Sequence, residues 1–283
     1  MSDRTASHPG LVARTRERTL SVNVLAADFT PPSLDDFFPK AVLFQGTPFE
    51  LDRVMLIRIL MTLVLCLVMV VAFRAPKIIP RGLQNVAEIG VQFVREQIAD
   101  EILGKESGKK FLPLLSTIFF AVLFMNLSSV IPGLNISPNA RIGMPIVLAA
   151  VAYVAFVGVG IKKYGFFSFV RHSTVVPNVP AAMHVMLIPI EFLSTFILRP
   201  FTLTVRLMAN MLAGHIMLVL FFSATSFFLL DADASWMKGL SPFSLLGGFA
   251  FTLFELLVIF LQAYVFTLLT AVYIGQSQHA DSH

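Results

Sequence analysis

Charged side chains are scarce in this chain of 283 residues: 13% are Asp, Glu, Lys or Arg, whereas 56% are hydrophobic. Ordinary soluble domains carry about 25% charged residues. The apolar residues form long blocks almost without charge, each at or above the roughly 20 residues that cross a hydrocarbon core as a helix. These blocks are 111–131, 142–161, 207–230 and 243–274, the last interrupted only by Glu255. The composition excludes an ordinary soluble domain and predicts an all-α polytopic transmembrane protein.

Cysteine is almost absent as well. Cys66 is the single cysteine, so the chain can form no internal disulfide. The formal net charge of +4 is compatible with nucleic-acid binding, but the basic residues are spread over loops and tail without the interleaved aromatic residues of a recognition module. We therefore expect membrane lipid and no nucleic acid among the partners, and neither a cofactor nor a bound metal.

The N-terminal region is expected to stay outside the membrane. Residues 1–53 form a polar, proline-containing tail, which we interpret as retained rather than as a removed targeting signal. The first span is expected at about 54–73. In the following segment, 83–103, apolar residues recur at helical spacing beside charged ones, which is typical of an amphipathic helix on the membrane surface. A helix packed on a partner protein would have the same pattern, and that alternative stays open.

Basic residues in the loops predict the topology. Spans two and three are expected at about 111–131 and 142–161. The loops before the second and after the third contain Arg74, Lys77, Arg81, Arg95, Lys105, Lys109, Lys110, Lys162, Lys163 and Arg171. The positive-inside rule places both loops in the cytoplasm and therefore the N-terminal tail outside. With five spans, the C-terminal tail, 276–283, is expected in the cytoplasm.

Residues 181–230 are too long for one upright span, since about 50 residues extend about 75 Å as a helix. In one interpretation, "RPFTLTVR" is an extracellular loop between two spans, with Arg199 and Arg206 at the interface. In the other, a single strongly tilted helix carries both arginines at membrane depth. The stretch has no Gly, Asn or Asp, and transmembrane helices tolerate proline, which favours the single helix.

The last span, about 241–275, is overlong too and must also tilt or protrude. The polar stretch "DADASWMKGLSP" between the two long segments predicts an antiparallel hairpin. Residue counts from this turn place His215 and Glu255 at nearly the same depth, and Arg206 near Gln262. Ionisable groups inside a membrane indicate a functional site by default, although polar groups that merely hold helices together are the alternative.

Helical phase separates these groups. At about 100° per residue, Arg199, Arg206 and Asn210 lie near one face of the helix, whereas His215 lies roughly opposite Arg206. Glu191 precedes Arg206 by about 22 Å in a straight helix. An arginine stays protonated and can hold a passing carboxylate ionised.

The other two groups suit proton exchange. Glu255 and Gln262 are seven residues apart and share a helix face. An imidazole and a carboxylate at one depth can pass a proton between them, because histidine titrates near neutrality and burial shifts a carboxylate toward it. His215 and Glu255 are therefore candidate members of a proton path.

Three motifs resemble one known family. Arg206-Leu207, Asn210 and Ala213-Gly214 are similar to the signature of subunit a of rotary F-type ATP synthases. The stretch "FELLVIFLQAYVFTLLTAVYI" resembles that family's last helix, and "FMNLSSVIPG" resembles its early Asn-Leu and Pro motif. The N-terminal "PSLDDFFPKAVLFQGTPFELDR" resembles actinobacterial members. The resemblance runs from about residue 34 to 275.

The resemblance implies a subunit of the bacterial plasma membrane with five transmembrane helices and a surface helix, the last two spans being long, tilted helices against a ring of c subunits. Arg206 would face the essential carboxylate of the ring and separate two aqueous half-channels. The inner half-channel would contain Glu191. The outer half-channel would be lined by Asn210, His215, Glu255 and Gln262.

The resemblance also implies a proton-channel stator subunit without catalysis of its own. The sequence has no G-x-x-x-x-G-K-[ST] loop, so nucleotide chemistry would occur on other ATP synthase subunits, with b-type stator subunits as further partners. The acid and histidine of many bacterial relatives are exchanged at 215 and 255. Two departures stand out: Ala209 replaces a frequent glycine, and Ser129 stands where some relatives have an acid. A self-contained cation/proton secondary transporter is the alternative, although matching internal halves are not evident. A structural assembly subunit is a third.

Overall fold

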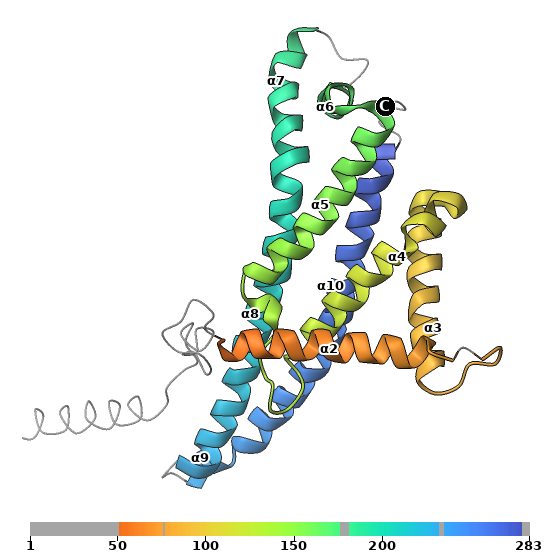
Figure 1. The fold of residues 1–283 in the computed structure, drawn as a ribbon. Helices are drawn as coiled ribbons and strands as arrows, with labels where there is room; N and C mark the ends of the chain where they lie inside the picture. Colours follow the sequence, from red (N-terminus) through yellow and green to blue (C-terminus); the bar gives the residue numbers. More distant parts are fainter. Residues whose placement is uncertain (1–50, 76, 176–180, 232–234, 279–283) are drawn as a thin grey trace, which may run out of the picture. The chain divides into compact units, whose positions relative to one another are not determined.

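The computed structural model describes residues 51–75, 77–175, 181–231 and 235–278 (Figure 1). Every element in these ranges is a helix. Five helical segments are long and apolar enough to cross a membrane: Arg53–Phe73, Leu83–Leu127, Gly143–Tyr164, Met183–Leu230 and Ser241–Gln278. The predicted all-α fold with five spans is therefore confirmed. The expected N-terminal tail lies almost entirely outside the described residues.

Helix α2, Arg53–Phe73, begins at a side-chain cap. Asp52 accepts a hydrogen bond of 2.8 Å from the backbone N–H of Met55, which satisfies one of the unpaired donors of the first turn. The Arg53 guanidinium donates to the carbonyl oxygens of Gly133 and Leu134 at 3.0 and 3.2 Å. The start of α2 is thereby fixed to the loop that follows the second span.

The segment that follows α2 turns back on itself at a glycine. Helix α3, Leu83–Val94, continues through the π-helical η2, Arg95–Ala99, into α4, Asp100–Leu127. Gly104 interrupts this run with a φ of 76°, a left-handed conformation that glycine adopts without steric cost. Figure 1 shows the chain reversing its direction between α3 and the long part of α4. The expected surface helix thus ends at the Gly104 kink, and its place at a membrane surface stays a prediction.

A buried polar turn and two helices follow α4. The 3-10 turn η3, Pro138–Ala140, leads into α5, Gly143–Tyr164. A short helix that the residue pattern did not predict, α6, comes next at Phe166–Thr174. Gly165, with a φ of 80°, forms the corner between α5 and α6.

The long segment before the hairpin is one continuous helix. Helix α7, Ala181–Leu193, passes through the π-helical η4, Ser194–Leu198, into α8, Arg199–Ser226, and then into η5, Phe227–Asp231. The apolar run Met183–Leu230 covers 48 residues, which confirms one long helix instead of two spans around "RPFTLTVR". The π turn ends just before Pro200, whose missing N–H would otherwise interrupt a regular α-helix. The tilt of this helix stays a prediction.

The chain ends with the short α9, Ser235–Lys238, and with α10, Ser241–Gln278, of 38 residues. The molecule divides into two compact units. In the first, Ile216–Phe251 folds as an antiparallel hairpin, in which the hydroxyl of Ser244 donates to the carbonyl of Phe221 at 3.0 Å. The second contains Asp35–His215 and Thr252–His283. Its described core joins α3, η2, α4, α5, α8 and α10 through buried side chains such as Val94, Phe119, Leu207 and Phe266.

Candidate functional site

A hydrogen bond between two amide side chains defines the centre of the candidate site. The Nδ2 group of Asn210 on α8 donates to Oε1 of Gln262 on α10 at 2.9 Å. Gln262 is 3% exposed, whereas Asn210 is exposed, so the bond lies at the edge of the contact between the two helices. Residue counts along the chain placed Gln262 nearest Arg206 in depth, but its partner is Asn210, one helical turn further along α8. One amide of each long helix is therefore paired across the helix contact, whereas the pairing of His215 with Glu255 stays a prediction.

Glu255 and Gly214 form the second contact of this helix pair. Glu255 is 1% exposed, although it is a carboxylate on a helix long and apolar enough to span a membrane. A Cβ atom added to Gly214 would lie 2.3 Å from both carboxylate oxygens. Glycine is therefore required for the carboxylate to occupy its present place against α8. His215, the next residue, is 6% exposed and belongs to the same buried region of the helix.

Two buried polar atoms lie on one face of α10. Oε1 of Glu255 and Nε2 of Gln262 are both buried, and neither has a hydrogen-bond partner among the described residues. The two residues are seven apart, so they lie two turns apart on the same face. Buried polar atoms almost always bind a protein group or an ordered water molecule. This face therefore suits a hydrated path for protons.

Arg206 lies on the outer surface of α8. Its side chain is exposed, whereas the adjacent Leu207 and the nearby Met211 are fully buried. No hydrogen-bond or ion-pair partner of Arg206 is found in the described part of the chain. The neighbours on the same face, Ala209 and Ala213, are exposed and small, so another helix can approach the guanidinium closely.

Arg199 has different surroundings from Arg206, although helical phase places both near one face. Its guanidinium lies 5.0 Å from the ring centre of Tyr273 on α10 and 5.7 Å from that of Phe156 on α5. Such cation–π contacts stabilise a cation where water is scarce. The two arginines differ in their exposure. Aromatic rings of α5 and α10 cover the start of α8 at Arg199, whereas Arg206 is exposed. Arg199 therefore joins three helices.

Glu191 does not join the cluster around Gln262. It lies half-buried on α7, and the π turn η4 separates it from Arg199 and Arg206. A π turn accommodates an additional residue, so a phase counted at 3.6 residues per turn does not carry across it. The structure therefore brings together Asn210, Gln262, Gly214 and Glu255, places His215 beside them, and leaves Glu191 apart.

A second buried polar cluster was not predicted from the sequence. Asn139 donates from Nδ2 to Oδ1 of Asn126 at 2.7 Å, and the hydroxyl of Ser137 reaches the same oxygen at 3.3 Å. All three side chains are fully buried. The signal was present in the two asparagines, which lie in or beside apolar stretches, but only the fold shows that they meet. Ser129 donates to the carbonyl of Asn126 at 2.8 Å and closes the same turn.

Comparison with known proteins identifies the family. The model of the family described as "ATP synthase A chain" matches residues 55–275. This range includes both long helices up to Gly275 and therefore the whole candidate site.

Several curated relatives match nearly the full length of the chain. The ATP synthase subunit a of Rhodococcus erythropolis is 64% identical over 272 residues, which are 95% of this chain and 98% of the relative. The protein of the same name from Pseudarthrobacter chlorophenolicus is 36% identical and covers 91% of this chain and 96% of its own. That of Streptomyces lividans is 40% identical over 82% of this chain and 81% of its own. The chain therefore belongs to the ATP synthase A chain family, that of ATP synthase subunit a.

Proposed function

We propose that this chain is the proton-translocating stator subunit of a rotary F-type ATP synthase, which carries protons to and from a ring of c subunits. The bond between Asn210 and Gln262 carries this proposal, because it pairs polar side chains of two long helices that are both apolar enough to span a membrane. Polar groups at membrane depth are costly and mark ion pathways. The paired amides lie between buried Glu255 on one side and exposed Arg206 on the other.

Arg206 acts as a fixed electrostatic gate. It is exposed on α8 and has no ion-pair partner among the described residues, so it is available to a carboxylate of the ring. A guanidinium close to a carboxylate lowers the pKa of that carboxylate by about 1–3 units and so favours release of its proton. Since arginine does not release its own proton, it also prevents a direct proton path between the two half-channels.

The outer half-channel contains His215, Glu255, Asn210 and Gln262. Glu255 and His215 exchange the proton, and the two amides orient water on the same helix face. The buried atoms of Glu255 and Gln262 that lack a partner in the described part of the protein support this role, since water can bind there. A proton that enters here neutralises a ring carboxylate before that carboxylate rotates into the lipid.

The inner half-channel contains Glu191. The half-buried carboxylate lies on α7, at the start of the long helix, whereas the turn to α10 follows the end of that helix. Basic residues follow the kink of α4 and end α5. By the positive-inside rule, they support a cytoplasmic location for the start of α7, with the N-terminus of the chain outside and its C-terminus inside. Each proton that crosses is driven by about 2.3 kcal/mol for every 100 mV of membrane potential.

The partners follow from this role. The ring of c subunits faces Arg206, Ala209 and Ala213, and b-type subunits hold the chain against rotation in the bacterial plasma membrane. Because a stator channel moves protons without forming or breaking phosphate bonds, nucleotide chemistry belongs to other subunits of the complex.

Complementation tests the function of the whole chain. Membranes from cells that lack the chain are expected to lose ATP-driven proton pumping, and the wild-type chain is expected to restore it. Site-specific cross-linking tests the partner in the same membranes. With Cys66→Ser as background, Ala209→Cys is expected to cross-link to a cysteine in the outer helix of a c subunit. Val154→Cys, which is exposed on α5, serves as the control and is expected not to react. Unchanged pumping without the chain would overturn the proposal.

A further inference from the structure

The short helix α6, Phe166–Thr174, has an exposed aromatic pair that the proposed proton path does not use. Phe167 is 87% exposed and Phe166 is 58% exposed. Their ring centres lie 5.5 Å apart, with the edge of one ring toward the face of the other. Exposure of two adjacent phenylalanine rings to water costs free energy. The pair therefore indicates a surface that an apolar environment covers.

A buried phenylalanine fixes α6 to the span before it. Phe169 is 1% exposed, and its ring centre lies 5.6 Å from that of Phe156 on α5 and 6.1 Å from that of Phe196 on η4. A Cβ atom added to Gly160 on α5 would lie 2.1 Å from the Phe169 ring, so glycine makes room for this contact. The orientation of α6 on α5 is thereby fixed, and with it the side on which the exposed pair lies.

The exposed pair lies at the end of a membrane span. Helix α5 is long and apolar enough to cross a membrane, and Phe166 follows its last residue by two positions, across the corner at Gly165. Figure 1 shows α6 beside the end of α5 and near the C-terminal end of α10. The Tyr164 hydroxyl donates to the carbonyl of Gln278, the last residue of α10, at 3.0 Å, so both spans end here. Helix α6 therefore lies where the hydrocarbon core meets the headgroups.

The charges at this corner are positive. Lys162 and Arg171 are exposed, and neither has a hydrogen-bond or ion-pair partner in the part of the chain that the structure describes. Lys163 donates to the carbonyl of Gln278, a neutral group that leaves the charge of the ammonium uncompensated. The corner can therefore attract an anionic surface.

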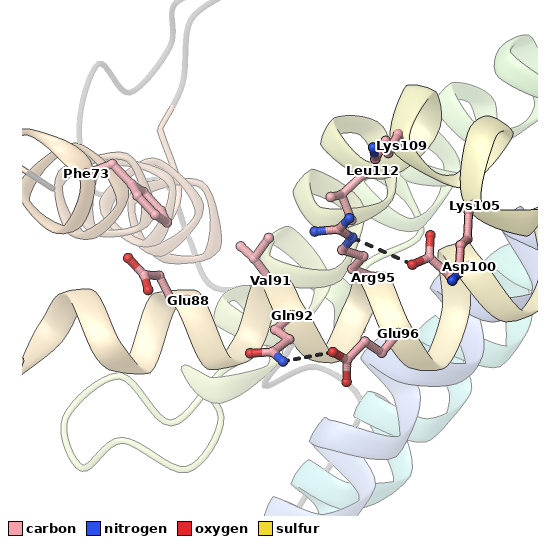
Figure 2. Close-up of a pocket in the computed structure, with 10 residues that line it drawn as sticks. All are labelled: Phe73, Glu88, Val91, Gln92, Arg95, Glu96, Asp100, Lys105, Lys109 and Leu112. Atoms are coloured by element: carbon pink, nitrogen blue, oxygen red, sulfur yellow. Dashed lines mark hydrogen bonds and ion pairs between the residues drawn. The ribbon is translucent and has the colours of Figure 1, made fainter. Parts of the chain in front are cut away.

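Acids are missing from this part of the sequence. Residues 107–190 contain no Asp or Glu, and Asp281, in the C-terminal tail, lies outside the described residues. Figure 2 shows that the cleft between α2, α3 and α4 differs, with three carboxylates beside three cations: Glu88, Glu96 and Asp100 with Arg95, Lys105 and Lys109. The charges of that cleft balance, whereas those of the corner between α5 and α6 do not.

The side chains of α6 are sorted by polarity around its axis. At about 100° per residue, Arg171 lies about 40° from Phe167, and Ser168 lies about 100° from Phe167. Ser168 and His172 share a polar face, and Arg171 lies between that face and the Phe167 ring. Helices with aromatic residues on one side and cations on the other lie in the membrane interface.

We propose that α6 anchors the chain in a leaflet that contains anionic phospholipid, with the rings of Phe166 and Phe167 among the acyl chains. Lys162 and Arg171 bind the lipid phosphates, because long cationic side chains reach headgroups from an apolar surface. A protein partner fits less well, since two phenylalanine rings offer less than the roughly 800 Å² that each side of a stable interface buries. The proposal needs α5 to span the membrane and is independent of the proton path.

Fluorescence quenching in the intact, reconstituted ATP synthase tests this anchor. With Cys66→Ser as background and the accessible cysteines of other subunits replaced, Phe167→Cys carries an NBD label. The vesicles contain phosphatidylcholine and phosphatidylglycerol, one of which has a nitroxide high on its acyl chain. We expect strong quenching by nitroxide lipid and weak quenching by iodide in the water. Ser168→Cys, on the polar face, is expected to show the opposite order.

Matched variants test the cations. At equal mole fraction, nitroxide on phosphatidylglycerol is expected to quench the label at 167 about twofold more than nitroxide on phosphatidylcholine. Lys162→Gln/Arg171→Gln is expected to abolish this difference. Lys109→Gln/Lys110→Gln removes the same charge from two exposed lysines on α4 and is expected to retain it. Lys162→Arg/Arg171→Lys is expected to retain it as well, which excludes a folding defect.

Three results would overturn the proposal. Strong quenching of the label at 167 by iodide would show that this face of α6 lies in water. Protection of the label from both quenchers would show that a protein covers the aromatic pair. Equal quenching by the two nitroxide lipids with Lys162 and Arg171 in place would show that the cations do not select anionic lipid. ATP-driven pumping by the same vesicles reports separately on the proposed function.

Discussion

Asn210 and Gln262 join the two long helices by a hydrogen bond of 2.9 Å between side chains 52 residues apart in the sequence. This bond fixes the register of α8 against α10, since it aligns Gly214 with Glu255 about one turn away along α8 and two along α10. The proposed outer half-channel depends on that register, because a slide of either helix would separate the polar side chains.

Removal of either amide is expected to impair proton transport in the same way. Asn210→Leu and Gln262→Leu each break the hydrogen bond that joins the two helices, so ATP-driven pumping should fall several-fold. Because the two amides act as one unit, the double variant should pump protons no more slowly than the slower of the two single variants. Quinacrine fluorescence quenching in inverted vesicles measures the rates. Additive losses would show that the two amides act separately.

Gly214→Ala is expected to move the Glu255 carboxylate while leaving the fold intact. The new Cβ would lie 2.3 Å from both carboxylate oxygens, and these oxygens end a side chain that can rotate. Pumping should therefore fall in a complex that still assembles. Gly158→Ala on α5 is the control, because an added Cβ there meets nothing within 4 Å. Equal pumping by the two variants would mean that the position of the carboxylate is unimportant.

Glu255→Gln is expected to change the pH dependence of proton transport. The amide has nearly the shape of the carboxyl group but cannot take up or release a proton in the physiological range. Passive proton flux through the membrane sector is measured from pH 5 to 9 by a pH-sensitive dye inside vesicles. In the variant, this flux should no longer change with pH over the range in which the Glu255 carboxyl exchanges its proton. A profile that coincides with that of the wild type would argue against proton relay by Glu255.

Arg199→Gln is expected to affect stability more than transport. Its guanidinium contacts the rings of Tyr273 and Phe156 at 5.0 and 5.7 Å, and such contacts contribute about 0.5–2 kcal/mol. The midpoint temperature for dissociation of the chain from the purified complex should fall by a few degrees, with pumping retained before heating. Tyr273→Leu should lower it similarly. Abolished pumping in an assembled Arg199→Gln complex would instead place Arg199 in the proton path.

Much of the fold could be predicted because a bilayer imposes a simple length rule. Apolar runs of about 20 residues predict spans. The overlong segment around "RPFTLTVR" is one helix. Its sequence predicted this, because proline is its only helix breaker and transmembrane helices tolerate proline. The polar turn before α10 predicted the antiparallel pairing that brings Asn210 to Gln262.

Local geometry was harder to predict. Nothing in the residue pattern distinguished Gly104, with its left-handed φ of 76°, from other glycines, and α6 is too short and polar for a span signal. The π turn at Ser194–Leu198 changes the phase of Glu191 relative to Arg206, and a count at a fixed 100° per residue misses it. The Asn126–Asn139 contact required the fold of the turn.

Arg206 is the residue on which the proposed mechanism depends most, because its exposed cation is assigned both the release of protons from the ring and the separation of the half-channels. ATP-driven proton pumping by inverted native membranes that contain Arg206→Ala tests both roles together, with exposed Arg81→Ala on the loop before α3 as control. We expect no pumping by Arg206→Ala in a fully assembled complex and normal pumping by the control. Unimpaired pumping by Arg206→Ala would contradict the mechanism.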